Sequence, residues 1–88
     1  MNPYSVVYLE DAEEELISTW EAAADRQAVT EAANLADRIL ASSPRDRSVY
    51  LGEELWRLEI QSVRFYFAIR EEDRVVEVSN VVRCDRSN

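Results

Sequence analysis

The 88-residue sequence contains no histidine and no lysine, so all ten of its basic residues are arginines. The lack of histidine removes the side chain that most often serves as a general base near neutral pH. It also excludes Ser-His-Asp and Cys-His catalytic sets and metal sites built on imidazole. The acid-rich segment that follows residue 9 is a poor ligand set without histidine or clustered cysteine, so we expect no bound metal.

Cysteine, glycine and long apolar runs are equally scarce. Cys84 is the single cysteine and cannot form an internal disulfide, and Gly52 is the single glycine, which excludes a glycine-rich phosphate loop. No apolar run approaches the roughly 20 residues of a membrane span. The first 15 residues carry five acids and no base, unlike a secretory leader. We therefore expect a cytoplasmic protein with no bound cofactor and an incidental thiol at Cys84.

Acidic residues dominate the charge of the chain. Eighteen acids against ten arginines give a net charge of -8, which opposes non-specific binding to nucleic acid. Two interpretations of this charge stay open: adaptation to a GC-rich or salty host, or a functional property. The length predicts a single domain over residues 1–88, with 47% hydrophobic residues to form its core.

The first half of the chain has the pattern of one strand and two helices. Residues 4–9 are rich in β-branched and aromatic types and predict a strand. A helix is expected from Glu10, because acids crowd its first turn and apolar residues follow at helical spacing. Asp25 is a suitable N-cap for a second helix, which ends at Ser42 before a polar loop. Its many alanines predict close packing of the two helices as a hairpin.

From residue 49 onward the hydrophobic period changes to two. Three strands fit, at about 54–60, 63–70 and 74–83, joined by turns at 61–62 and 71–73. These turns place apolar residues opposite one another, as in the pairs Leu58–Phe65, Phe67–Val78 and Val63–Val82. The predicted fold class is α+β, in the order β-α-α-β-β-β, with an antiparallel sheet packed on the helical hairpin on one face. Trp20 and Trp56 fall in phase with the apolar stripes and are expected in the core.

The opposite face of the predicted sheet holds the best candidate site. Its candidate catalytic residues are Arg57, Arg64, Tyr66 and Arg83. Guanidinium groups beside a phenol can bind a phosphate and stabilise developing negative charge. The alternative is structural, because Glu59 is expected opposite Arg64 and would form an ordinary cross-strand ion pair with it. Arginine and tyrosine are also typical of protein interfaces, which makes this face a candidate partner surface.

The order and spacing of these segments resemble the RelE/ParE toxin superfamily. The similar segments are residues 4–9 with Ala12, Glu15-Leu16 and Trp20; residues 32–40 with Pro44; residues 55–58 with 63–69; and residues 74–78. The resemblance implies a toxin-like component of a type II toxin–antitoxin system, neutralised by an antitoxin protein that wraps it and is encoded nearby. Family members include ribosome-dependent messenger-RNA nucleases, gyrase poisons and copies without known activity. The ribosome with its mRNA, or gyrase, is thus the implied target.

The chain departs from the nuclease members of that family in two ways. Those members are typically basic and some end in a His-Tyr pair, whereas this chain is acidic and ends Val82-Arg83-Cys84-Asp85-Arg86 before its last two residues. The alternative function is therefore a non-catalytic binding module on the same fold. Arginines of the open face without carboxylate partners favour the toxin; arginines paired to Glu59 and Glu77 favour the module.

Overall fold

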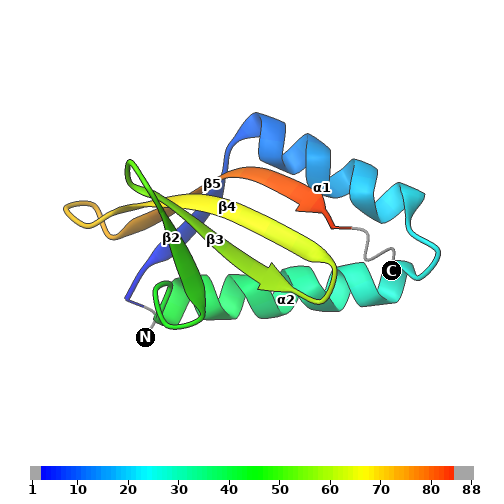
Figure 1. Cartoon of the computed structure of the whole chain (residues 1–88), viewed down its shortest axis with the longest axis horizontal. Coiled ribbons are helices and arrows are strands. Elements are labelled where there is room, and N and C mark those ends of the chain that lie inside the picture. The colour runs from blue at the N-terminus through cyan, green and yellow to red at the C-terminus, as the bar shows by residue number, and fades with distance from the viewer. Residues whose placement is uncertain (1–2, 85–88) are drawn as a thin grey trace.

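The computed structural model describes residues 3–84, which form two helices and one five-stranded sheet (Figure 1). The elements are β1 (Ser5–Tyr8), α1 (Glu10–Ala22), α2 (Arg26–Ser42), β2 (Ser48–Gly52), β3 (Leu55–Ile60), β4 (Val63–Arg70) and β5 (Val75–Arg83). The strand order across the sheet is β1-β5-β4-β3-β2. Among the described residues, no helix is long and apolar enough to cross a membrane.

The α+β class is confirmed, but the sheet differs from the prediction in two respects. It is mixed, because β1 runs parallel to β5 while the other neighbours are antiparallel. The sheet also has an additional strand, β2, in a segment to which no strand was assigned. Val49, Tyr50 and Leu51 are three consecutive apolar residues, and all three are exposed in this edge strand. The strand therefore lacks the alternation of apolar and polar residues that marks a half-buried strand.

The two helices begin where the sequence indicates. Three acids occupy the first turn of α1, and the Asp25 side chain accepts a hydrogen bond from the Ala28 amide at 3.1 Å, which caps α2. The buried alanines Ala32 and Ala36 let α2 lie close to the sheet. The two helices pack against each other and on the sheet, with α1 mainly on β5 and α2 against β1, β3 and β4. In the view of Figure 1 the two helices diverge from the turn that joins them, and β5 lies between them.

The central strand β4 supplies the middle of the core. Phe65 and Phe67 are fully buried and pair with Leu58 and Trp56 of β3 in the predicted register. Phe67 also pairs with Val78 of β5, again as predicted. Apolar residues of α1, α2, β3, β4 and β5 join in one buried cluster, so both helices cover the same face of the sheet.

A β-bulge in β5 overturns the last part of the predicted register. Phe67 pairs with Val78 and Tyr66 with Asn80, so Ser79 is an extra residue without an opposite partner in β4. Beyond the bulge, Val81 turns into the core and Val82 is 43% exposed. The predicted pair of Val63 with Val82 is therefore wrong, because Val63 pairs with Arg83.

Glu15 of α1 fixes the part of β5 that lies beyond β1. The pairing of β1 with β5 ends at Val78, which leaves the edge of the remaining residues of β5 without a neighbouring strand. The Glu15 carboxylate accepts a hydrogen bond from the Val81 amide at 2.8 Å and from the Asn80 side chain at 3.3 Å. An inward-directed acid on a covering helix satisfies an edge that would otherwise be available to another strand.

Trp20 lies outside the core, contrary to the prediction. Its side chain is 40% exposed, and its indole Nε1 donates a hydrogen bond to Thr30 Oγ1 at 3.1 Å. The Arg26 guanidinium lies 4.7 Å from the centroid of the ring. Trp20 therefore joins the end of α1 to the start of α2 at the surface. Trp56 is partly buried against the core and stacks on Phe67, with ring centroids 6.5 Å apart.

The bulge makes a direct prediction for stability. Val81→Ala should destabilise the protein by about 2 kcal/mol, because it removes two buried carbon groups and leaves a cavity. Val82→Ala should change stability by less than about 0.5 kcal/mol, since that side chain is exposed. Urea denaturation of the two variants measures the difference. Equal effects, or a larger effect at Val82, would contradict the bulge and support the register predicted from the sequence.

Candidate functional site

The face of the sheet away from the helices places Arg57 and Tyr66 directly opposite each other. Arg57 comes from β3 and Tyr66 from β4, and Glu59 and Arg64 form the next pair on the same face. The alternation that buries Phe65 and Phe67 sends these side chains to the other side, where Arg57, Arg64 and Tyr66 are half-buried. The structure places these three residues on the predicted face, and their catalytic role stays a prediction.

Two arginines of this open face are held by carboxylates. Arg64 Nε lies 3.1 Å from Glu59 Oε1, and Arg70 donates from Nε and Nη2 to Glu77 Oε1 at 3.2 and 3.0 Å. The hydrogen bond to Glu59, then the charge of Cys84 and a hydrogen bond to Tyr66, raise the pKa of Arg64. These contacts orient Arg64 beside the Tyr66 phenol. They also neutralise much of the positive charge that the face would offer to an anion.

Arg57 differs from these two arginines. Within residues 3–84, no ion pair or side-chain hydrogen bond engages its guanidinium. It lies on the open face between Val49 of the edge strand β2 and Tyr66 of the central strand β4. Arg57 is therefore the open-face arginine best placed to bind a phosphate or carboxylate, with the Tyr66 hydroxyl as a neighbouring polar group.

Arg83 is not part of this face. It pairs with the buried Val63, so the bulge at Ser79 carries it to the helix side of the sheet. There it lines a cleft of about 190 Å³ together with Thr19 and Asp25. The structure thus brings together Arg57, Arg64 and Tyr66 but separates Arg83 from them. A pattern of alternation alone cannot reveal this, because one inserted residue reverses every later side chain.

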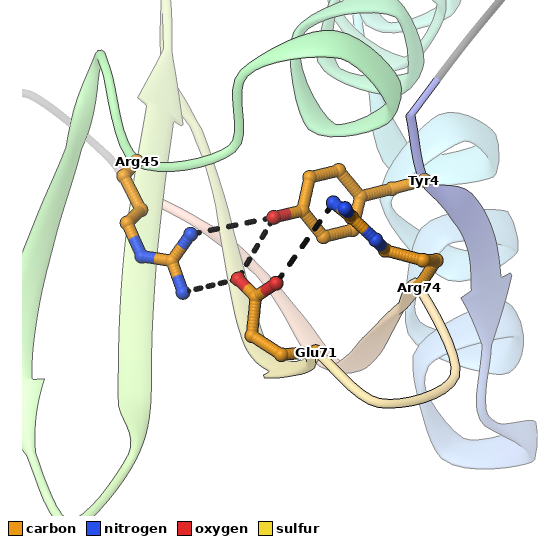
Figure 2. Close-up of polar contacts among 4 residues, drawn as sticks. All are labelled: Tyr4, Arg45, Glu71 and Arg74. Atoms are coloured by element: carbon orange, nitrogen blue, oxygen red, sulfur yellow. Dashed lines mark hydrogen bonds and ion pairs between the residues drawn. The ribbon is translucent and has the colours of Figure 1, made fainter.

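A second polar cluster, which the sequence prediction missed, lies at the turn between β4 and β5. Figure 2 shows Tyr4, Arg45 and Arg74 converging on Glu71. Glu71 Oε2 accepts from the Tyr4 hydroxyl at 2.8 Å and from Arg45 Nη2 at 2.6 Å, and Oε1 lies 4.0 Å from Arg74 Nη1. These residues come from the position just before β1, the loop after α2 and the turn between β4 and β5, so no sequence motif connects them.

The hydrogen bond from Tyr4, followed by that from Arg45, lowers the pKa of Glu71. Both arginines also lie near aromatic rings: Arg45 is 5.7 Å from the Trp56 centroid, and Arg74 is 5.6 Å from that of Tyr4. All four groups thus have partners inside the cluster. The arrangement ties three chain segments together, and its carboxylate is occupied by its own neighbours.

Two of the other clefts along the helices border α2. One, of about 820 Å³, lies between β1 and the second half of α2, where the Tyr8 hydroxyl donates to Asp37 Oδ1 at 2.9 Å. Burial of the phenol, then the Asp37 charge, raises the pKa of Tyr8. The other, of about 370 Å³, is an apolar groove between α1 and α2 beside Trp20. Within the described part of the chain, no group of three acidic, cysteine or histidine side chains could hold a metal.

Comparison with known proteins identifies the fold. The toxin–antitoxin complex RelBE2 from Mycobacterium tuberculosis matches with a TM-score of 0.78 at 17% identity, covering 94% of this chain and 93% of that one. The archaeal RelE–RelB complex from Pyrococcus horikoshii gives 0.69 at 16% identity, covering 97% and 99%. The isolated E. coli RelE toxin gives 0.68 at 17% identity, covering 97% and 88%.

No family model and no curated protein matches the sequence. At these identities the solved structures show the fold alone, and the chain has the fold of the RelE toxins, as the resemblance predicted. The match extends over nearly the whole of this chain and of the toxins. A shared fold does not by itself carry a shared activity, which has to be argued from the site.

The lowered pKa of Glu71 predicts an acid-sensitive contribution to stability. A carboxyl whose pKa is lower in the folded than in the unfolded state stabilises the fold above the unfolded pKa, and this stabilisation is lost as the pH falls through the folded value. Glu71→Gln should therefore be less stable than wild type near neutral pH, and the difference should shrink below about pH 4. Thermal unfolding across this range measures it.

Glu72→Gln is the matched control, since Glu72 is an exposed neighbour in the same turn. Its difference from wild type should stay small and nearly constant over the same range. A Glu71→Gln difference that does not change with pH would show that the cluster acts through packing, without a charge contribution.

Proposed function

We propose that this chain is the toxin-like component of a type II toxin–antitoxin system. The observation that carries the proposal is the match of nearly the whole chain to RelE structures, two of which come from complexes with a RelB partner. On this proposal the partner is an antitoxin protein encoded nearby. The chain inhibits translation, through ribosome-dependent cleavage of mRNA, or inhibits gyrase, when the antitoxin releases it.

The open face supports an antitoxin interface. It combines apolar area from Leu55 and Ala68 with Arg57 and Tyr66, the residue types that protein interfaces favour. Acidic side chains of an antitoxin tail that folds as it binds would pair with Arg57 first, because Arg64 already contacts Glu59. Covering this face would also block any activity that depends on these residues.

The same residues define the chemistry available to a released toxin. Arg57 and Arg64 would bind a phosphate and stabilise charge that develops on it, and the Tyr66 phenol would position the group. No histidine is present to act as a base. Cleavage of RNA would therefore depend on the 2′-hydroxyl of the substrate as nucleophile and on groups of the ribosome for positioning.

A non-catalytic binding module is the second candidate function. The observation that favours it is the pairing of Arg64 with Glu59 and of Arg70 with Glu77, which leaves little unbalanced positive charge on the open face. Net charge of -8 adds long-range repulsion of any phosphate polymer. In this case the chain binds its antitoxin but has no toxic action of its own.

Induction of the chain in cells separates the two candidates. A toxin should arrest growth when expressed alone and should be relieved by co-expression of the neighbouring small gene product. Measurement of protein synthesis and of plasmid supercoiling in the arrested cells then distinguishes translation from gyrase as the target. Binding of that gene product without any growth arrest would assign the module.

The charge of the chain predicts its behaviour toward free RNA. The purified protein should not cleave naked RNA at physiological salt, because a net charge of -8 weakens the encounter and no histidine supplies a base. Gel analysis of a defined RNA after prolonged incubation tests this. Rapid cleavage that Arg57→Ala or Arg64→Ala abolishes would contradict it and would make the chain an independent nuclease.

The proposed interface predicts which substitutions weaken the antitoxin. Arg57→Ala and Tyr66→Ala should each reduce affinity by about tenfold or more, since central arginine and tyrosine side chains dominate such interfaces. Calorimetric titration of the co-expressed pair measures the effect, with thermal unfolding as a check on folding. Arg83→Ala, on the helix side of the sheet, is the control. Unchanged affinity for both open-face variants would place the antitoxin elsewhere.

A further inference from the structure

A carboxylate lies within the group of side chains that forms the candidate site on the open face. Glu59 of β3 is opposite Arg64 of β4, and Arg57 is opposite Tyr66 in the next pair along the same strands. The four side chains leave the sheet on the same side, because residues two apart on a strand share a face. Arg57 and Arg64 are therefore diagonal neighbours, with Cα atoms about 7–8 Å apart, and their long side chains can reach one anion.

The contact of Glu59 with Arg64 is a single hydrogen bond at a partly exposed position. Arg64 Nε lies 3.1 Å from Glu59 Oε1, and the two side chains are 33% and 30% exposed. Arg70, by comparison, donates from two nitrogens to Glu77. Ion pairs accessible to solvent typically shift an equilibrium by no more than about fivefold. An anion that fits the arginines better can therefore displace Glu59 from Arg64.

The donors of this group suit a phosphate better than a carboxylate. Arg57 and Arg64 approach from two different strands, with the Tyr66 hydroxyl between them on the face. A carboxylate has two oxygens in one plane, which match the fork of a single guanidinium. The oxygens of a phosphate diester point in tetrahedral directions, so two guanidiniums can each donate to it. A phosphate therefore gains from Arg57 and Arg64 together, whereas Glu59 holds Arg64 by one nitrogen.

We propose that Glu59 is an intramolecular competitor of RNA phosphate, which holds Arg64 until a phosphate diester displaces it. This inference rests on the toxin-like function proposed above, which makes RNA the ligand of the open face. Displacement turns the Glu59 carboxylate toward solvent and lets both guanidiniums share one anion. The carboxylate thereby lowers the affinity of the free chain for RNA. Binding then depends on a surface that presents the RNA at high local concentration.

Neutralisation of Glu59 tests the proposal. Glu59→Gln removes the charge and keeps the size of the side chain. Titration of the purified chain into a short fluorescein-labelled oligouridylate at low salt, followed by fluorescence anisotropy, measures RNA affinity. Glu59→Gln should bind the RNA about fivefold more tightly than wild type, because Arg64 no longer has to leave an ion pair.

Glu77→Gln is the matched control. Both substitutions remove one acid, so each variant has a net charge of -7 in place of -8. Glu77→Gln releases Arg70 instead, which lies at the far end of β4. Its affinity for the RNA should rise by less than about twofold, through net charge alone. Thermal unfolding confirms that each variant is folded.

A double-mutant cycle locates the effect at Arg64. In an Arg64→Ala background, the gain from Glu59→Gln should fall to that of Glu77→Gln, because the carboxylate acts through that guanidinium. A gain that persists without Arg64, or one no larger than the control, overturns the proposal. RNA binding too weak to measure in every variant overturns it as well.

A glutamate oligopeptide of the same charge as the RNA distinguishes phosphate from carboxylate ligands. A gain with the peptide but none with the RNA overturns the proposal and assigns the group to acidic side chains of a protein partner. Failure of this inference is distinct from failure of the proposed function, because growth arrest tests the toxin and the titration tests Glu59. A chain that arrests growth without a gain in Glu59→Gln keeps the function and loses the competitor.

Discussion

The burial of Phe65 and Phe67 on one face of β4 is the constraint on which the rest of this structure depends. Both side chains are fully buried, and β4 lies in the centre of the sheet with its neighbours paired on each side. The alanines of α2 let the helix approach them closely, and β3 and β5 take their registers from the same strand. A change of face in β4 would therefore expose the core and dismantle both hairpins.

The same alternation links the core to the candidate site. By turning its phenylalanines toward the helices, β4 presents Arg64 and Tyr66 on the other face, opposite Glu59 and Arg57 of β3. One extra residue in β5 then turns both Val81 and Arg83 to the helix side of the sheet, which buries Val81 and removes Arg83 from this group. The arginines and the tyrosine of the open face thus come from β3 and β4, and Arg57 is the arginine of this face without an ion pair among the described residues.

The edges of the sheet differ in what covers them. The exposed end of β5 is satisfied by Glu15 from α1, whose carboxylate accepts the Val81 amide. β2 at the other edge has no such cover, and its apolar residues remain exposed between Arg47 and Glu53. The outer strands of the sheet are β1 and β2, and the part of β5 beyond Val78 is a further stretch of edge, which the Glu15 carboxylate satisfies.

Local pattern was sufficient to predict the helices, the three main strands and the pairing of Leu58 with Phe65, because capping, helical spacing and two-residue periodicity depend only on neighbours in the chain. It also placed Arg57, Arg64 and Tyr66 on one face. The tertiary structure decided the rest. β2 forms because a sheet edge was available, although its side chains show no alternation; the bulge at Ser79 reverses Arg83; and Tyr4 meets Glu71 only through the fold. These outcomes depend on contacts between distant segments, which no local sequence signal encodes.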